Sequence, residues 1–74
     1  MSSQKHATLV ELGRRIRDFR RLKGWTQTDM AVCLDIARTY ISEIENGKRE
    51  VGVITLQIIA KGLGTTMSKI LNNL

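Results

Sequence analysis

The amino-acid sequence predicts an all-α protein that folds as one compact domain of five helices. Three observations support this prediction. The 74 residues include no proline, and no run of strand length alternates β-branched with polar residues. Apolar residues recur instead at intervals of three and four, which places them on one face of a helix. A chain of this length holds a single domain with a small core, so dimerisation or well-packed helices would help to stabilise it.

The first expected helix covers residues 8–23, where the domain of residues 8–74 begins, and the polar residues 1–7 are expected to form a flexible tail. Thr8 is followed by Glu11 in the spacing of a capping box, which predicts that the helix begins at Thr8. Gly24 is the residue type that commonly ends a helix. Most arginines of this segment are interpreted as a solvated face whose stems cover the edge of the core. The expected inner stripe consists of Leu9, Leu12, Ile16 and Phe19.

Two short helices at the centre of the chain, near residues 27–34 and 37–46, form a predicted helix-turn-helix. Thr26 and Asp29 have the spacing of a reciprocal capping box, and Trp25 with Met30 has that of a hydrophobic staple. Asp35 tolerates the left-handed conformation that a sharp turn between the helices needs. The inner face of the second helix consists of Tyr40, Ile41 and Ile44.

The last two expected helices cover residues 53–63 and 67–71, with Gly64 ending the first and Thr66 capping the second. The buried stripe is expected to consist of Val53, Leu56, Ile59, Ala60 and Leu63. The remaining apolar residues either form a homodimer interface or close the core against the first helix. These candidate dimer residues are Ile54, Ile58, Met67, Ile70, Leu71 and Leu74.

The composition narrows the functional classes. A formal charge of +5 and a pI near 10 favour a polyanionic partner. The single His6, the single Cys33 and the lack of clustered carboxylates predict no catalytic site, no metal site and no cofactor. No apolar run is long enough to span a membrane, and no signal peptide is recognisable, so a cytoplasmic protein is expected. No small-molecule effector site is evident.

Four segments follow one another in a characteristic order: GRRIRDFRRLKGWTQ, QTDMA, YISEIENGKR and LQIIAKGLG. In these segments the chain resembles the helix-turn-helix family of phage repressors and Cro proteins, also called the xenobiotic-response-element family, from Leu12 to about Ile70. Within this family, the chain is particularly similar to the controller proteins of restriction–modification systems in the segments RTYIS, EIENGKRE and LQIIAKGL. The chain departs from the family at Asp35, where glycine is common, and at Val51–Gly52, which replaces a more usual Pro-Ser pair.

The resemblance implies a repressor-like DNA-binding domain and a transcriptional regulator. Such a regulator binds a (pseudo)palindromic operator in double-stranded DNA through the major groove as a homodimer. Transcriptional activation would add RNA polymerase as a partner. The alternative is an antitoxin or another protein-interaction module that uses the same fold.

A recognition helix presents its N-terminal residues to base edges in the major groove. In this chain these are Ala37, Arg38 and Thr39, with Glu43 one turn further along. Arg38 can donate two hydrogen bonds to O6 and N7 of guanine, and Thr39 can offer a hydroxyl to a base and a methyl group to thymine. Glu43 either accepts a hydrogen bond from cytosine N4 or holds a neighbouring arginine in position.

Other residues are expected to contact phosphates. Gln27 stands at the N-terminus of the helix over residues 27–34, where backbone N–H groups and the helix dipole favour an anion. The further candidates are Tyr40, Ser42, Asn46, Lys48 and Arg49. The family resemblance also implies a structural ion pair between Arg20 and Glu45, which removes Arg20 from the DNA-binding charges.

Overall fold

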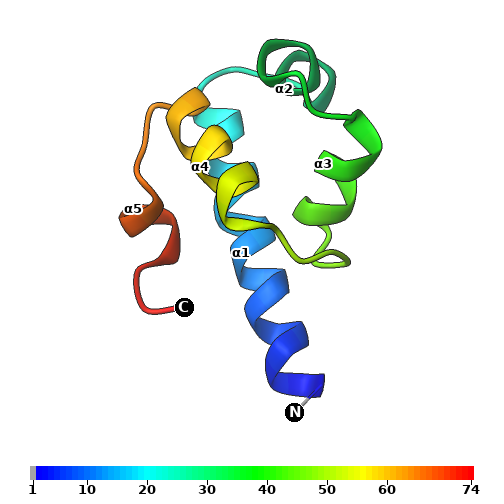
Figure 1. The fold of residues 1–74 in the computed structure, drawn as a ribbon, viewed down its shortest axis with the longest axis vertical. Helices are drawn as coiled ribbons and strands as arrows, with labels where there is room; N and C mark the ends of the chain where they lie inside the picture. Colours follow the sequence, from blue (N-terminus) through cyan, green and yellow to red (C-terminus); the bar gives the residue numbers. More distant parts are fainter. Residues whose placement is uncertain (1) are drawn as a thin grey trace.

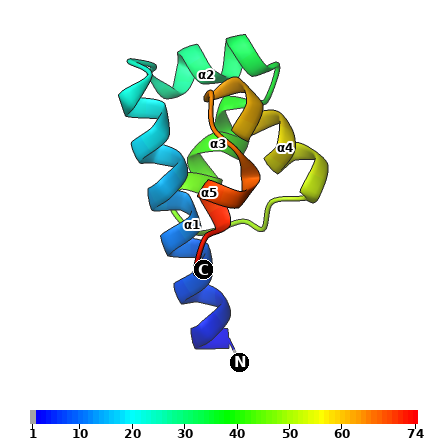
Figure 2. The same cartoon turned by 90° about the vertical axis from the view of Figure 1, so that its left-hand side faces the viewer.

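Five helices account for most of the chain, which the computed structural model describes over residues 2–74, with side chains from Gln4 onward. They are α1 (Ser2–Leu22), α2 (Gln27–Leu34), α3 (Arg38–Glu45), α4 (Val53–Gly62) and α5 (Met67–Leu71). No strand occurs among these residues, so the predicted all-α class is confirmed. α1 runs along the domain, and the other four helices gather around its C-terminal part (Figures 1 and 2).

α1 begins earlier than the sequence predicted. It starts at Ser2 instead of Thr8, so the predicted capping box at Thr8 is wrong. Residues 2–7 contain no proline or glycine to stop the helix, and Glu11 pairs with arginines further along α1 instead of reaching back. The expected flexible tail therefore forms the first helical turns, apart from Met1, which lies outside the described residues. Both views show these turns projecting beyond the other helices (Figures 1 and 2).

The predicted start and end of α2 are confirmed. The amide of Asp29 donates to Oγ1 of Thr26 at 3.0 Å, and the amide of Thr26 donates to Oδ2 of Asp29 at 2.9 Å. Asp35 ends the helix in the left-handed conformation, with φ 54° and ψ 46°. Met30 is fully buried and Trp25 packs against the core. Local sequence therefore fixes where α2 begins and where it ends.

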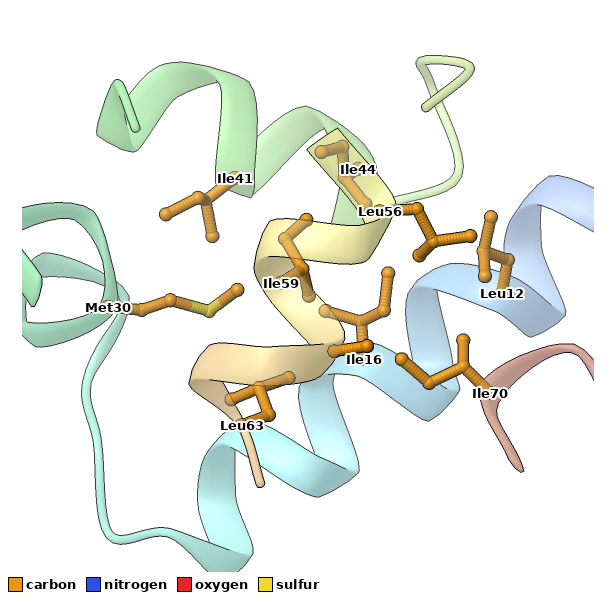
Figure 3. Packing of buried hydrophobic residues seen from close by; sticks show 10 residues of the cluster. Leu12, Ile16, Met30, Ile41, Ile44, Leu56, Ile59, Leu63 and Ile70 are labelled. Atoms are coloured by element: carbon orange, nitrogen blue, oxygen red, sulfur yellow. The ribbon is translucent and has the colours of Figure 1, made fainter. Parts of the chain in front are cut away.

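The core lies between α1, α3, α4 and α5, and Met30 closes it from α2 (Figure 3). Ten apolar side chains are buried there: Leu12, Ile16, Met30, Ile41, Ile44, Leu56, Ile59, Ala60, Leu63 and Ile70. The predicted stripe of α4 holds from Leu56 onward, but Val53 is 70% exposed, so its predicted burial is wrong. Val53 is the first residue of α4, one turn before the helix reaches the core.

α1 and α3 approach each other closely at Gly13, in the middle of α1. A Cβ atom at this position would lie 2.8 Å from the carbonyl oxygen of Glu45 and would also overlap the carbonyl oxygen of Ile44. Both oxygens belong to the last residues of α3. Glycine therefore lets α1 support the C-terminal end of α3 directly, at the expense of some helix propensity.

Candidate nucleic-acid interface

The N-terminal end of α3 is exposed. Its N-cap Ala37 and its first two residues, Arg38 and Thr39, are all open to solvent. At 3.6 residues per turn, Thr39 points away from the buried Ile41 and Ile44. Arg38 lies on the side of α3, between its exposed and buried faces. None of the ion pairs in the described part of the chain involves Arg38. Its guanidinium is therefore available at the end of the helix predicted to meet base edges.

Glu43, one turn further along α3, is engaged by an arginine. Its Oε1 accepts a hydrogen bond from Nε of Arg49 at 3.0 Å. The guanidinium carbon of Arg49 also lies 4.8 Å from the centroid of the Tyr40 ring, within the range of a cation–π interaction. Tyr40 packs against the edge of the core. Of the two alternatives for Glu43, the free protein adopts the one in which it holds a neighbouring arginine.

The turn after α3 brings the basic loop back beside the helix. Gly47 has a φ of 70°, and the amide of Lys48 donates to the carbonyl oxygen of Glu43 at 2.9 Å. Within the last turn of α3, Nδ2 of Asn46 donates weakly to Oγ of Ser42 at 3.4 Å. Lys48 and Asn46 are exposed, and Ser42 is half-buried. Three predicted phosphate contacts therefore share one end of α3 (green in Figure 1).

Arg20 of α1 and Glu45 of α3 form a buried ion pair between the two helices. Nε of Arg20 donates to Oε2 of Glu45 at 2.7 Å, and Nη2 donates to Oε1 at 2.9 Å. Arg20 also donates from Nη1 to the carbonyl oxygen of Trp25 at 2.7 Å. The hydrogen bonds to Glu45 raise the pKa of Arg20. Arg20 thus joins α1, α3 and the α1–α2 connection, and it points away from the exposed face of α3.

Gln27 is half-buried at the start of α2 and makes a structural contact there. Its Nε2 donates to Oε1 of Glu45 at 3.1 Å, which ties α2 to the buried ion pair. An amide nitrogen carries two protons, so one N–H of Gln27 remains for a phosphate. Arg17 supports the same region, because its Nη2 donates to the carbonyl oxygen of Glu45 at 3.3 Å. The sequence did not predict either contact.

Comparison with known proteins assigns the chain to a protein family. The helix-turn-helix family profile matches residues 16–70. The chain belongs to the helix-turn-helix family of DNA-binding regulators. It is 36% identical over 66 residues to the control protein C.MunI of Mycoplasma sp, covering 88% of this chain and 89% of that protein.

Two solved structures of controller proteins resemble this helix-turn-helix regulator. The restriction–modification controller protein C.AhdI of Aeromonas hydrophila has a TM-score of 0.83 at 30% identity, covering 86% of this chain and 97% of that chain. The controller protein C.Esp1396I, solved as a tetramer in complex with its natural 35-base-pair operator, has a TM-score of 0.76 at 35% identity. That match covers 85% of this chain and 83% of the other.

Arg15 has a role in this helix-turn-helix domain that the sequence did not indicate. We expected a solvated side chain, but its Nη1 donates to the carbonyl oxygens of Ile70 at 2.9 Å and Asn72 at 2.6 Å. Glu11 holds the guanidinium in place by accepting from Nε at 2.9 Å. Hydrogen bonds from Arg14 and Arg15 lower the pKa of Glu11 from 4.5 to about 2. Arg15 therefore caps the C-terminal end of α5 from α1.

The candidate dimer residues differ in their exposure. Ile54 is 68% exposed and Ile58 is 44% exposed, and Val53 extends the same apolar surface at the start of α4. Leu71 and Leu74 are also exposed, whereas Met67 packs partly against the core. Ile70 is fully buried within the protomer. The prediction that Ile70 contributes to a dimer interface is therefore wrong, because its side chain is already used to close the core against α1.

The described part of the chain contains neither a metal-binding cluster nor a membrane-spanning helix. No group of three or more His, Cys, Asp or Glu residues there is arranged to hold a metal ion. None of its helices combines the length and apolar character that a membrane span requires. The single Cys33 is exposed on α2.

Proposed function

We propose that this helix-turn-helix regulator is a restriction–modification controller protein that binds a (pseudo)palindromic operator as a homodimer. The observation that carries the proposal is the exposed N-terminal end of α3, where Arg38 and Thr39 are both open to solvent and Thr39 faces away from the core. The similarity to C.MunI and C.AhdI over most of both chains supports the controller assignment. The net charge of +5 supports a polyanionic partner.

Base recognition depends on Arg38 in this proposal. Its guanidinium can donate two parallel hydrogen bonds to O6 and N7 of guanine once α3 enters the major groove. Thr39 beside it can contact a base with its hydroxyl or its methyl group. Ala37 adds no bulk, so the N-terminal end of α3 can approach the base pairs closely.

Phosphate contacts would fix the register of α3. Lys48 and Asn46 lie at the C-terminal end of α3, and Gln27 lies at the start of α2. Contacts of this kind flank the recognition helix and carry affinity without sequence information. The exposed first turn of α2 also offers the positive end of a helix dipole to the backbone.

A homodimer is required because one recognition helix contacts too few base pairs to select a single site in a genome. An isologous interface formed by α4 and the C-terminal segment is supported by their exposed apolar residues. These residues are Ile54, Ile58, Leu71 and Leu74. α5 lies across the domain from α3 in Figure 1, so this surface leaves the recognition helix free. RNA polymerase as a further partner is part of the controller proposal, and no residue is assigned to it.

The experiment compares Arg38→Ala with Lys69→Ala, which removes one positive charge from exposed α5. Fluorescence anisotropy measures binding of each variant to a duplex selected from a random library and to a scrambled duplex. Loss of one bidentate base contact should lower the preference for the selected duplex roughly 5- to 150-fold, corresponding to about 1–3 kcal/mol. Lys69→Ala should retain the preference. Undiminished discrimination by Arg38→Ala would count against this reading of α3.

A further inference from the structure

Three side chains form a cluster on the exposed side of α3 that base recognition by Arg38 does not use. Arg49 from the loop after α3 donates from Nε to Glu43, and its guanidinium lies over the ring of Tyr40. The side chains of Arg49 and Glu43 are 54% and 41% exposed. An exposed ion pair alone restrains a side chain weakly. Here the carboxylate fixes the edge of the guanidinium while the aromatic ring fixes its face.

The two contacts leave the other edge of the guanidinium unused. Arginine has five N–H donors, and among the hydrogen bonds of the described residues Arg49 uses only the one on Nε. Its two Nη groups carry the remaining four donors in a rigid planar fork. This fork has the geometry that binds two oxygens of one phosphate.

The carboxylate of Glu43 itself is poorly suited to approach DNA without a counterion. An unpaired carboxylate beside phosphates meets repulsion, and burying it against a base costs desolvation. Paired with Arg49, Glu43 enters the interface as part of a neutral unit. The backbone bond from the amide of Lys48 to the carbonyl oxygen of Glu43 brings the loop to the position where this pairing is possible.

We propose that Glu43 is a positioning residue that reads no base and instead holds Arg49 against Tyr40 as a preformed phosphate-binding fork. This inference rests on the proposed DNA-binding function and assigns a role within it. It predicts that Glu43 contributes to affinity for every duplex equally. It also predicts that this contribution depends on Arg49.

The direction in which Glu43→Gln changes DNA affinity distinguishes a positioning role of Glu43 from an effect of its charge alone. Glu43→Gln raises the net charge of the protein by one, which by itself would tighten binding to DNA and increase its salt dependence. If Glu43 positions Arg49, the same substitution should weaken binding about 3- to 10-fold for selected and scrambled duplexes alike, because the fork is no longer preorganised. The log–log salt slope should not steepen despite the added positive charge, because the released Arg49 side chain is no longer held against a phosphate.

The test measures binding of the wild-type protein, Glu43→Gln, Arg49→Ala and the double variant to a panel of duplexes with single base changes, at several salt concentrations. Positioning predicts the weakening described above in the wild-type background and no weakening in the Arg49→Ala background. Glu43 as a base reader predicts a changed preference at one base position in both backgrounds. That result, or tighter binding by Glu43→Gln with a steeper salt slope, would overturn the proposal.

A measurement without DNA keeps the outcome separate from the proposed function. The ring of Tyr40 should shift the NMR signals of the Arg49 side chain in the free protein, and Glu43→Gln should move them towards random-coil values. Unshifted Arg49 signals in the wild-type protein would overturn the positioning geometry even if DNA binds. Shifted signals in a protein that binds no duplex selectively would overturn the function proposed for α3 and leave the side-chain arrangement standing.

Discussion

Glu45 is the residue on which three helices converge. Its carboxylate accepts two hydrogen bonds from Arg20 and one from Gln27, and only 1% of its side chain is exposed. A buried carboxylate is tolerated only when paired and hydrogen-bonded in this way. Because Glu45 is also the last residue of α3, the pair holds α3 against α1 and α2.

Removing one partner of this pair should be strongly destabilising. Arg20→Ala would leave the carboxylate of Glu45 buried without its main counterion, and we expect a loss of about 3–5 kcal/mol in the free energy of unfolding. Urea denaturation followed by circular dichroism measures this loss. Arg21→Ala is the matched control, since it truncates the exposed neighbouring arginine and should change stability by about 0.5 kcal/mol or less. Equal losses for the two variants would contradict the structural role of Arg20.

At the scale of elements, short helices depend on their ends. α5 has only five residues, too few to be stable alone. Thr66 caps its N-terminus by accepting from the amide of Lys69 at 3.1 Å. Arg15 on α1 caps its C-terminus and places a positive charge at the negative end of the helix dipole. α5 is therefore held by one local cap and one cap from a distant part of the sequence.

Arg15→Ala should loosen α5 selectively. Without the guanidinium, the carbonyl oxygens of Ile70 and Asn72 lose their donor, so amide hydrogen exchange in α5 should accelerate more than in α2. Arg14→Ala is a suitable control, because it removes the other arginine bound to Glu11 without touching α5. Equal exchange rates in α5 for both variants would show that Arg15 does not cap this helix.

The elements that the sequence predicted correctly are those whose signals are local. The capping box of Thr26 and Asp29 and the left-handed Asp35 depend on residues within one turn, and both occur as predicted. The same capping signature at Thr8 failed because the residues before it also form a helix. A capping motif marks a helix start only where the preceding segment does not continue the helix.

The long-range contacts could not be predicted in the same way. Arg15 and Ile70 are 55 residues apart, and nothing in either segment indicates that they meet. The burial of Ile70 likewise follows from where α5 docks on α1, which helical spacing does not specify. For Glu43, the helical period predicted its exposed face, but the choice between its two roles needed the geometry of the Gly47 turn.

The whole molecule has two surfaces of different character. The face of α3 is polar and lies beside a basic loop, whereas α4 and the C-terminal segment expose apolar side chains. This separation allows a dimer to form through one surface while two copies of α3 remain free to reach successive turns of DNA. The small core of a 74-residue chain would also gain stability from burial of the apolar surface.

Ile54→Glu should disrupt the dimer without unfolding the protomer. Ile54 is 68% exposed, so a charge at this position is solvated in the monomer but buried in an interface on α4. Sedimentation equilibrium should show a dimer for the wild-type protein and a monomer for the variant at tens of micromolar protein. Val32→Glu places the same charge at a 76% exposed apolar position on α2 and should leave the dimer intact. Dimeric Ile54→Glu would exclude this surface as the interface.

Selection of bound duplexes from a random library by the wild-type protein tests the central claim most directly. Two copies of α3 in a symmetric dimer should enrich one consensus with two inverted half-sites. Their centres should be about 10 base pairs, or roughly 34 Å, apart. Enrichment of duplexes without a shared consensus, or of a single half-site without symmetry, would contradict the account of this chain as a dimeric, sequence-specific regulator.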